Sequence, residues 1–165
     1  MEETAMKQKE MSGYLKVITA GVGILLLVFV LWFLPLVLKE PLTRIAGSSG
    51  YRGVCKVTAL SAVPAVMCLI RFWGICGSIG QDRSFSMENA VRLKRMSQYM
   101  LLDAVLYTGF LVWFFTAGWY QGAAWLVFPI LLAVFISVAL TVLCAALSHL
   151  VQNASELQEE QELTI

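Results

Sequence analysis

The stretch that decides the fold is residues 104–155, AVLYTGFLVWFFTAGWYQGAAWLVFPILLAVFISVALTVLCAALSHLVQNAS. These 52 residues contain no Asp, Glu, Lys or Arg, and His149 is their only histidine. About 20 apolar helical residues cross a bilayer core of about 30 Å, so the stretch is too long for one crossing and fits two. The segment GWYQG at 118–122 supplies the turn, because glycines bend the chain and aromatic residues favour the membrane interface. We therefore predict spans at about 99–118 and 123–147.

A further span lies near the start of the chain. Residues 17–38 are 22 residues without a charge. Pro35 falls in the last turn, and Pro41 lies just outside, where we expect the helix to stop. A signal peptide is the competing interpretation, but its apolar core would be only about 7–15 residues long and a small-residue cleavage site would follow. The length and the Lys-Glu-Pro that follows favour a retained helix.

The remaining span, at about 54–79, is interrupted by charge. Its uncharged part, residues 57–70, is too short to cross alone. It becomes long enough if Lys56 extends its charge to one membrane surface and Arg71 lies near the other.

The composition agrees with these spans. Hydrophobic residues make up 59% of the 165 residues and charged residues 14%, whereas soluble domains carry about 25% charge. We predict an all-α integral membrane four-helix bundle forming one domain over residues 1–165. The lipid bilayer is thus the first expected partner. A net charge of +1 argues against direct nucleic-acid binding, and the oligomeric state, including a homo-oligomer, is left open.

The distribution of Lys and Arg predicts the orientation. Seven of them precede span one or separate spans two and three: Lys7, Lys9, Lys16, Arg83, Arg92, Lys94 and Arg95. The connection between spans one and two offers three, Lys39, Arg44 and Arg52, and the turn after span three offers none. Positively charged loops stay in the cytosol, so both termini are expected there.

The connection between spans two and three predicts a basic amphipathic helix at about 86–98 that runs directly into span three. Ser86 is a suitable N-cap, and Glu88 in the first turn faces the positive end of the helix dipole. Glu88 and Arg92 are four residues apart in the favourable order. The basic residues have two interpretations: they set the orientation and contact anionic lipid, or they bind a protein or a nucleic acid.

The tail, residues 148–165, becomes acidic towards its end, although acidic residues oppose the dipole at a helix C-terminus. We expect the tail to pack back on the basic helix, and a solvated acidic surface is the alternative. Together the two segments form a candidate interaction surface: Phe85, Glu88, Asn89, Arg92, Lys94, Arg95, Glu156, Glu159 and Glu160.

Two charged residues fall inside predicted spans. Arg71 lies about two turns before the end of span two, and Asp103 about one turn after span three begins. Intramembrane charges are costly and usually have a partner, so we predict an Arg71–Asp103 ion pair joining the two helices. Separate snorkelling and a proton or ion path are the alternatives.

No reaction can be assigned from the residues. The four cysteines form no C-x-x-C pair and have no histidine at metal-binding spacing. No nucleophile stands beside a base. We therefore expect no enzyme, catalytic residue, metal or cofactor.

Two segments resemble a known family. The sequence Ser84-Phe85-Ser86-Met87-Glu88-Asn89, followed by residues 92–95, and the ending at 154–165 are similar to motifs of the domain of unknown function 2975 family. The resemblance covers essentially the whole chain, with specific matches in these segments only. Glu162 stands where Asp is common, and Ser84 where Pro is common.

The resemblance implies a four-helix protein of the bacterial cytoplasmic membrane, often encoded beside a small helix-turn-helix regulator. It carries no catalytic residues. The function expected first is a regulatory or interaction protein whose cytosolic surface holds a partner such as that regulator. The alternative is a small transporter, channel subunit or immunity-type membrane protein.

Overall fold

The computed structural model describes residues 2–81 and 85–163, with side chains for residues 10–81 and 85–160. Lys7, Lys9 and Arg83 of the orientation argument, and Ser84 and Glu162 of the family motifs, have side chains outside this part. Every described element is a helix, which confirms the all-α class. The elements are α1 Glu2–Val28, the π-helix η1 Phe29–Phe33, α2 Leu34–Ile79, α3 Met87–Thr116, α4 Tyr120–Ala123, the 3₁₀ helix η2 Ala124–Leu126 and α5 Val127–Leu163.

Three stretches of the described chain are long and apolar enough to cross a membrane: Glu10–Ile79, Met87–Thr116 and Tyr120–Glu160. Four were predicted, and the count differs because the first two predicted spans belong to one helical stretch of 70 residues. In the most apolar 18-residue segment of each stretch, only 6%, 22% and 17% of the residues, in that order, are buried inside the molecule. Most of this apolar surface therefore needs an apolar environment outside the protein.

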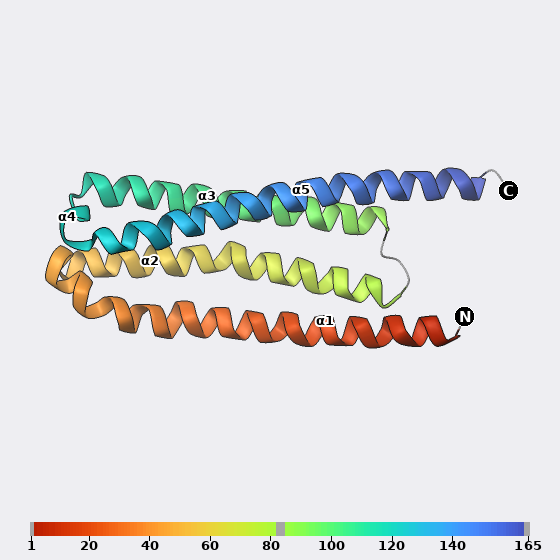
Figure 1. Cartoon of the computed structure of the whole chain (residues 1–165), viewed down its shortest axis with the longest axis horizontal. Coiled ribbons are helices and arrows are strands. Elements are labelled where there is room, and N and C mark those ends of the chain that lie inside the picture. The colour runs from red at the N-terminus through yellow and green to blue at the C-terminus, as the bar shows by residue number, and fades with distance from the viewer. Residues whose placement is uncertain (1, 82–84, 164–165) are drawn as a thin grey trace.

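The first stretch reverses direction at Gly47. This glycine has φ 67° and is the only residue of α2 with non-helical torsions, a conformation that glycine adopts at little cost. Figure 1 shows the chain before and after this point lying side by side. The Tyr51 hydroxyl donates to the Pro35 carbonyl (3.2 Å) near the reversal, and the Ser12 hydroxyl donates to the Cys76 carbonyl (2.6 Å) far from it.

The helix does not stop at Pro41, so that prediction is wrong. Pro41 lies within α2, and the break comes six residues later. An interior proline lacks a hydrogen-bond donor and crowds the preceding turn, yet here it does not end the helix. The earlier Pro35 follows the π-helix, whose wider turn is closed by a bond from the Leu34 amide to the Phe29 carbonyl. Such π turns are rare and occur mostly as single turns inside α-helices.

The predicted start of the third long helix is confirmed. Ser86 is the N-cap of α3, and its hydroxyl accepts a hydrogen bond from the backbone N–H of Asn89 (3.4 Å). Glu88 lies in the first turn. The helix then runs without a break from Met87 to Thr116. The turn predicted around Gly118 is also present, since Gly118 has φ 74°.

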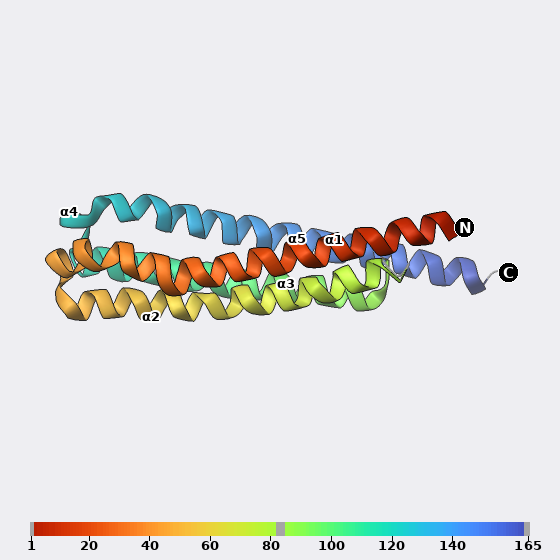
Figure 2. The ribbon, with the colours of Figure 1, turned by 90° about the horizontal axis from the view of Figure 1, so that it is seen from below.

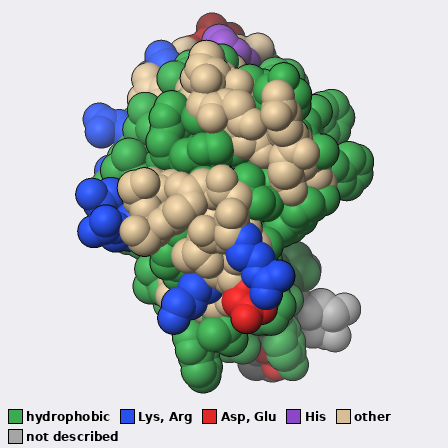
Figure 3. Space-filling view, turned by 90° about the vertical axis from the view of Figure 1, so that its left-hand side faces the viewer, with side chains coloured by type: hydrophobic (Ala, Val, Ile, Leu, Met, Phe, Trp, Pro, Cys, Tyr) green, Lys and Arg blue, Asp and Glu red, His purple; other side chains and the backbone are tan. Residues whose placement is uncertain are grey.

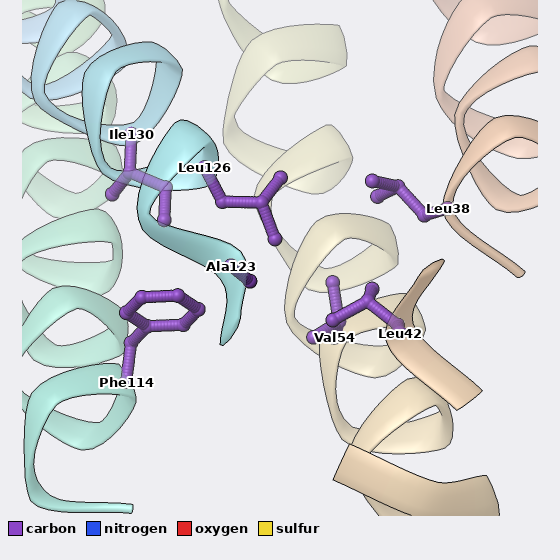
Figure 4. Close-up of a cluster of buried hydrophobic side chains, with 7 residues drawn as sticks. All are labelled: Leu38, Leu42, Val54, Phe114, Ala123, Leu126 and Ile130. Atoms are coloured by element: carbon purple, nitrogen blue, oxygen red, sulfur yellow. The ribbon is translucent and has the colours of Figure 1, made fainter. Parts of the chain in front are cut away.

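The long helices pack in chain order, with α1 on α2, α2 on α3, and α3 most extensively on α5. α2, α3 and α5 reach the end of the molecule that holds Gly47 and Gly118. There they form one cluster of buried side chains with α4 and η2 (Figure 4): Leu38, Leu42, Val54, Phe114, Ala123, Leu126 and Ile130. Glycine is required there for close approach, because a Cβ at Gly53 would lie 2.6 Å from the Trp113 ring. We call this the aromatic end. Figures 1 and 2 show that both termini lie at the opposite end, the terminal end.

Candidate functional site

A polar layer joins the helices at the terminal end. Its centre is Arg92 of α3, whose Nη1 donates to the Gly74 carbonyl (2.8 Å) and to the Ser78 hydroxyl (2.9 Å) of α2. The guanidinium therefore provides donors for backbone and side-chain acceptors near the end of α2, and such charge-assisted bonds are stronger than neutral ones.

Two residues of the predicted interaction surface are used inside this layer. Asn89 is only 1% exposed, and its Oδ1 accepts from Arg92 (3.2 Å). Arg92 also pairs with Glu88, as the four-residue spacing predicts, and its side chain is 23% exposed. Asn89 thus does not belong to the surface, and Arg92 serves mainly to hold α2 against α3. The spacing of charges along the sequence did not reveal this role, because it depends on the position of α2.

Two serines extend the layer to the outer helices. The Ser12 hydroxyl of α1 donates to the Cys76 carbonyl of α2, and the Ser148 hydroxyl of α5 donates to the Ala90 carbonyl of α3 (2.7 Å). Both serines are buried. Together with Arg92 they link α1 to α2, α2 to α3, and α3 to α5.

The exposed part of the terminal end is more apolar than predicted. Phe85 is 57% exposed, and Met87 and Val91 are also exposed. Met87, Val91 and Arg95 are spaced four residues apart and therefore lie on one side of α3. Lys94 and Arg95 are exposed there as predicted. We define the α3 face as Phe85, Met87, Val91, Lys94 and Arg95; the Met87–Val91 spacing was the signal that sequence reasoning missed.

The acidic tail does not pack back on the basic residues, so that prediction is wrong. The Ser148–Ala90 bond sets the antiparallel register of α5 and α3. At 1.5 Å per residue, Glu156 lies about 12 Å beyond this level in one direction and Arg95 about 7.5 Å in the other. The α5 helix instead extends past the start of α3 (Figure 1), and Glu156 accepts from Gln152 of the same helix (3.1 Å).

The three predicted acidic surface residues are all exposed on this extension. Glu156, Glu159 and Glu160 follow one another along the last turns of α5 that have described side chains. The exposed Leu157 lies among them. The α5 extension, residues 152–160, is thus an acidic helix with an apolar side chain on its surface.

The predicted ion pair between Arg71 and Asp103 does not form between these described side chains. Asp103 is 8% exposed and faces α5, where its Oδ2 accepts from the Ser137 hydroxyl (3.2 Å). Its Oδ1 is buried and has no hydrogen-bond partner in the described structure. Arg71 is half-buried. The sequence places Arg71 and Asp103 at a similar depth in the membrane, but similar depth is not enough for an ion pair. The two side chains must also lie on the helix faces that meet each other.

Polar contacts also cross the interior between the two ends. The hydroxyls of Ser61 in α2 and Tyr107 in α3 are 2.9 Å apart, and Ser97 of α3 donates to the Thr141 carbonyl of α5 (3.0 Å). Tyr107 lies one turn along α3 from Asp103. These contacts fix α3 against both neighbours. Among the described residues, no group of three or more His, Cys, Asp or Glu could hold a metal ion.

Comparison with known families gives a match along the length of the chain. Residues 2–165 match the family described as "Protein of unknown function (DUF2975)". The chain belongs to the DUF2975 family. This match confirms the resemblance carried by the segments near Phe85 and after Ala154. No curated protein and no solved structure matches this DUF2975 chain.

Proposed function

We propose that this DUF2975 protein crosses the cytoplasmic membrane of a bacterium four times and presents its terminal end to a cytosolic protein. The 70-residue stretch Glu10–Ile79 would be about 105 Å long as one straight helix, more than three times the bilayer core. The reversal at Gly47 divides it into two passes, each long enough to cross. With the two later stretches, this gives four crossings.

The basic residues support a cytosolic terminal end. Lys16, Arg92, Lys94 and Arg95 all belong to this half of the molecule, whereas Lys39, Arg44 and Arg52 lie near the Gly47 reversal. The larger positive charge, seven residues against three in the sequence, stays in the cytosol. Both termini are then cytosolic.

The observation that carries the interaction role is the α3 face. Apolar side chains exposed beside positive charges, outside the most apolar part of the helix, are typical of a surface that another protein covers. The α5 extension adds a negatively charged helix that projects beyond the start of α3. A helix-turn-helix regulator is the partner we propose, because regulators of that kind are often encoded beside members of the family that the motifs resemble.

The partner is tested by site-specific photocrosslinking in native membranes. A photoreactive residue at Val91 should form an adduct with the helix-turn-helix protein encoded nearest to this gene. A matched probe at Val105, an exposed position on the apolar part of the same helix, should not. Arg95→Glu should weaken the Val91 adduct. An adduct of equal yield at both positions, or none with that protein, overturns the regulator proposal.

A second candidate function is ion or proton transport by a small transporter or channel subunit. The buried Asp103 carboxylate, with its unpartnered Oδ1, is the observation that favours it, since intramembrane ionisable groups often mark ion paths. An ion or proton flux across proteoliposome membranes that is lost in Asp103→Asn and kept in Glu40→Gln would support transport. Flux that is equal to that of empty liposomes would exclude it.

A further inference from the structure

An apolar groove of about 380 Å³ opens between the first pass and the start of α5. Its walls include Phe33 and Val37 from the first pass, Phe110 of α3, and Trp125 and Ala133 from the other side. The π-helix η1 forms part of the rim, with the Phe29 and Phe33 rings stacked at 5.4 Å. The volume is in the range of small-molecule sites, about 300–1,000 Å³.

A second hollow, of about 340 Å³, continues the groove towards the Gly47 reversal. Trp125 borders both hollows. Phe33, Val37, Pro41 and Arg44 follow one another at helical spacing, so a single side of the first pass lines the two cavities in succession. The second hollow is charged, because Glu40 and Arg44 line it.

Glu40 and Arg44 carry opposite charges but do not form an ion pair with each other. They are four residues apart, and both are exposed. The ion pair found among the described side chains is Arg92–Glu88, and none joins Glu40 to Arg44. Figure 3 shows this end of the molecule, where basic side chains flank an acidic one among hydrophobic surface. A ligand with one phosphate and one ammonium group would complement both charges.

The dimensions fit one leaflet of a bilayer. Phe33 and Arg44 are eleven residues apart, or about 16 Å along the helix. Half of the hydrocarbon core is about 15 Å. Trp119, Tyr120 and Trp125 lie at the same end as Arg44, as aromatic residues do at the level of lipid headgroups.

We propose that this face binds one phospholipid with a phosphoethanolamine headgroup. Its acyl chain lies in the apolar groove, the Arg44 guanidinium contacts the phosphate, and the Glu40 carboxylate contacts the ammonium. This inference rests on the proposed membrane crossing and is independent of the proposed cytosolic partner.

Native mass spectrometry of the detergent-purified full chain tests the site, with phosphatidylethanolamine, phosphatidylglycerol or phosphatidylcholine added. The wild type should retain one phosphatidylethanolamine most strongly. Arg44→Gln should lower its affinity about tenfold, the loss expected for a charged hydrogen bond. Arg52→Gln, an exposed arginine near the same turn that does not line either hollow, should not. Glu40→Gln should shift the preference towards phosphatidylglycerol, because the ammonium loses its partner.

A second pair of variants tests the groove itself. Ala133→Phe should fill it and abolish retention of the lipid, whereas Ala59→Phe, at an exposed alanine of α2, should leave retention unchanged. Equal retention of all three lipids, or equal retention by the two phenylalanine variants, overturns the site. Neither result affects the proposed membrane crossing. That proposal fails on its own test, if the chain is a water-soluble monomer without detergent.

Discussion

The two ends of this DUF2975 protein are held together by different forces. At the aromatic end, buried side chains and glycine contacts bring α2, α3 and α5 into one cluster. At the terminal end, Arg92, Ser12 and Ser148 join the helices through a few hydrogen bonds, mostly to backbone carbonyls. Tight packing is sensitive to small changes in shape, whereas a few hydrogen bonds can exchange. The terminal end is thus the more adaptable part, which agrees with the proposed role of holding and releasing a partner.

The largest effect is expected at the aromatic end. Phe114 is completely buried, so Phe114→Ala should lower the free energy of unfolding by about 3 kcal/mol or more through the cavity it leaves. The neighbouring Phe115 is exposed, and Phe115→Ala should have little effect. Denaturant titration in detergent measures both. Similar losses in the two variants would show that the cluster is not the main source of stability.

A smaller, local effect is expected at the terminal end. Arg92→Met removes the bonds to Gly74 and Ser78, which should lower stability by about 1–3 kcal/mol. It should also speed hydrogen exchange at the start of α3. The control is Arg95→Met, which removes an exposed arginine one turn later. If exchange at residues 87–92 stays as slow as in the wild type, Arg92 does not hold the two helices.

The interior between the ends can be tested with two double-mutant cycles. Asp103→Asn and Ser137→Ala should be coupled by about 1 kcal/mol, because the two side chains share a hydrogen bond. Asp103→Asn and Arg71→Gln should be additive within about 0.5 kcal/mol. Unfolding free energies in detergent give both coupling values. Stronger coupling to Arg71 than to Ser137 would restore the ion pair predicted from the sequence.

The smallest effect is expected on the α5 extension. Reversing the charges of Glu156 and Glu159 should leave the melting temperature unchanged, since neither side chain makes an ion pair in the described structure. The same variant should change the yield of the Val91 crosslink to the proposed helix-turn-helix partner. A fall in melting temperature would mean that the extension folds onto the protein after all.

Local features were predictable from the sequence, and helix-to-helix relations were not. Ser86 caps α3 and Gly118 turns the chain because each acts on its own neighbours. Pro41 was expected to end a helix by the same local reasoning, yet the reversal occurs at Gly47, where torsions that favour glycine are adopted.

The failures at the candidate site all involve two helices. Asn89 is buried, Arg92 bonds to α2, and Asp103 faces Ser137 because of how the helices are rotated and aligned against each other. The sequence pattern contains no information about that register. Depth along a helix can be estimated by counting residues, but the facing side of a neighbour cannot.

The central claim is that the chain reverses at Gly47 on the far side of the membrane and keeps its terminal end in the cytosol. Single cysteines at Ser48 and at Gln158, in a variant whose four native cysteines are replaced by alanine, test it directly with a membrane-impermeant thiol reagent. In intact cells the reagent should label the cysteine at 48, and should label the one at 158 only after permeabilisation. The reverse pattern, or labelling of both from outside, would contradict the claim.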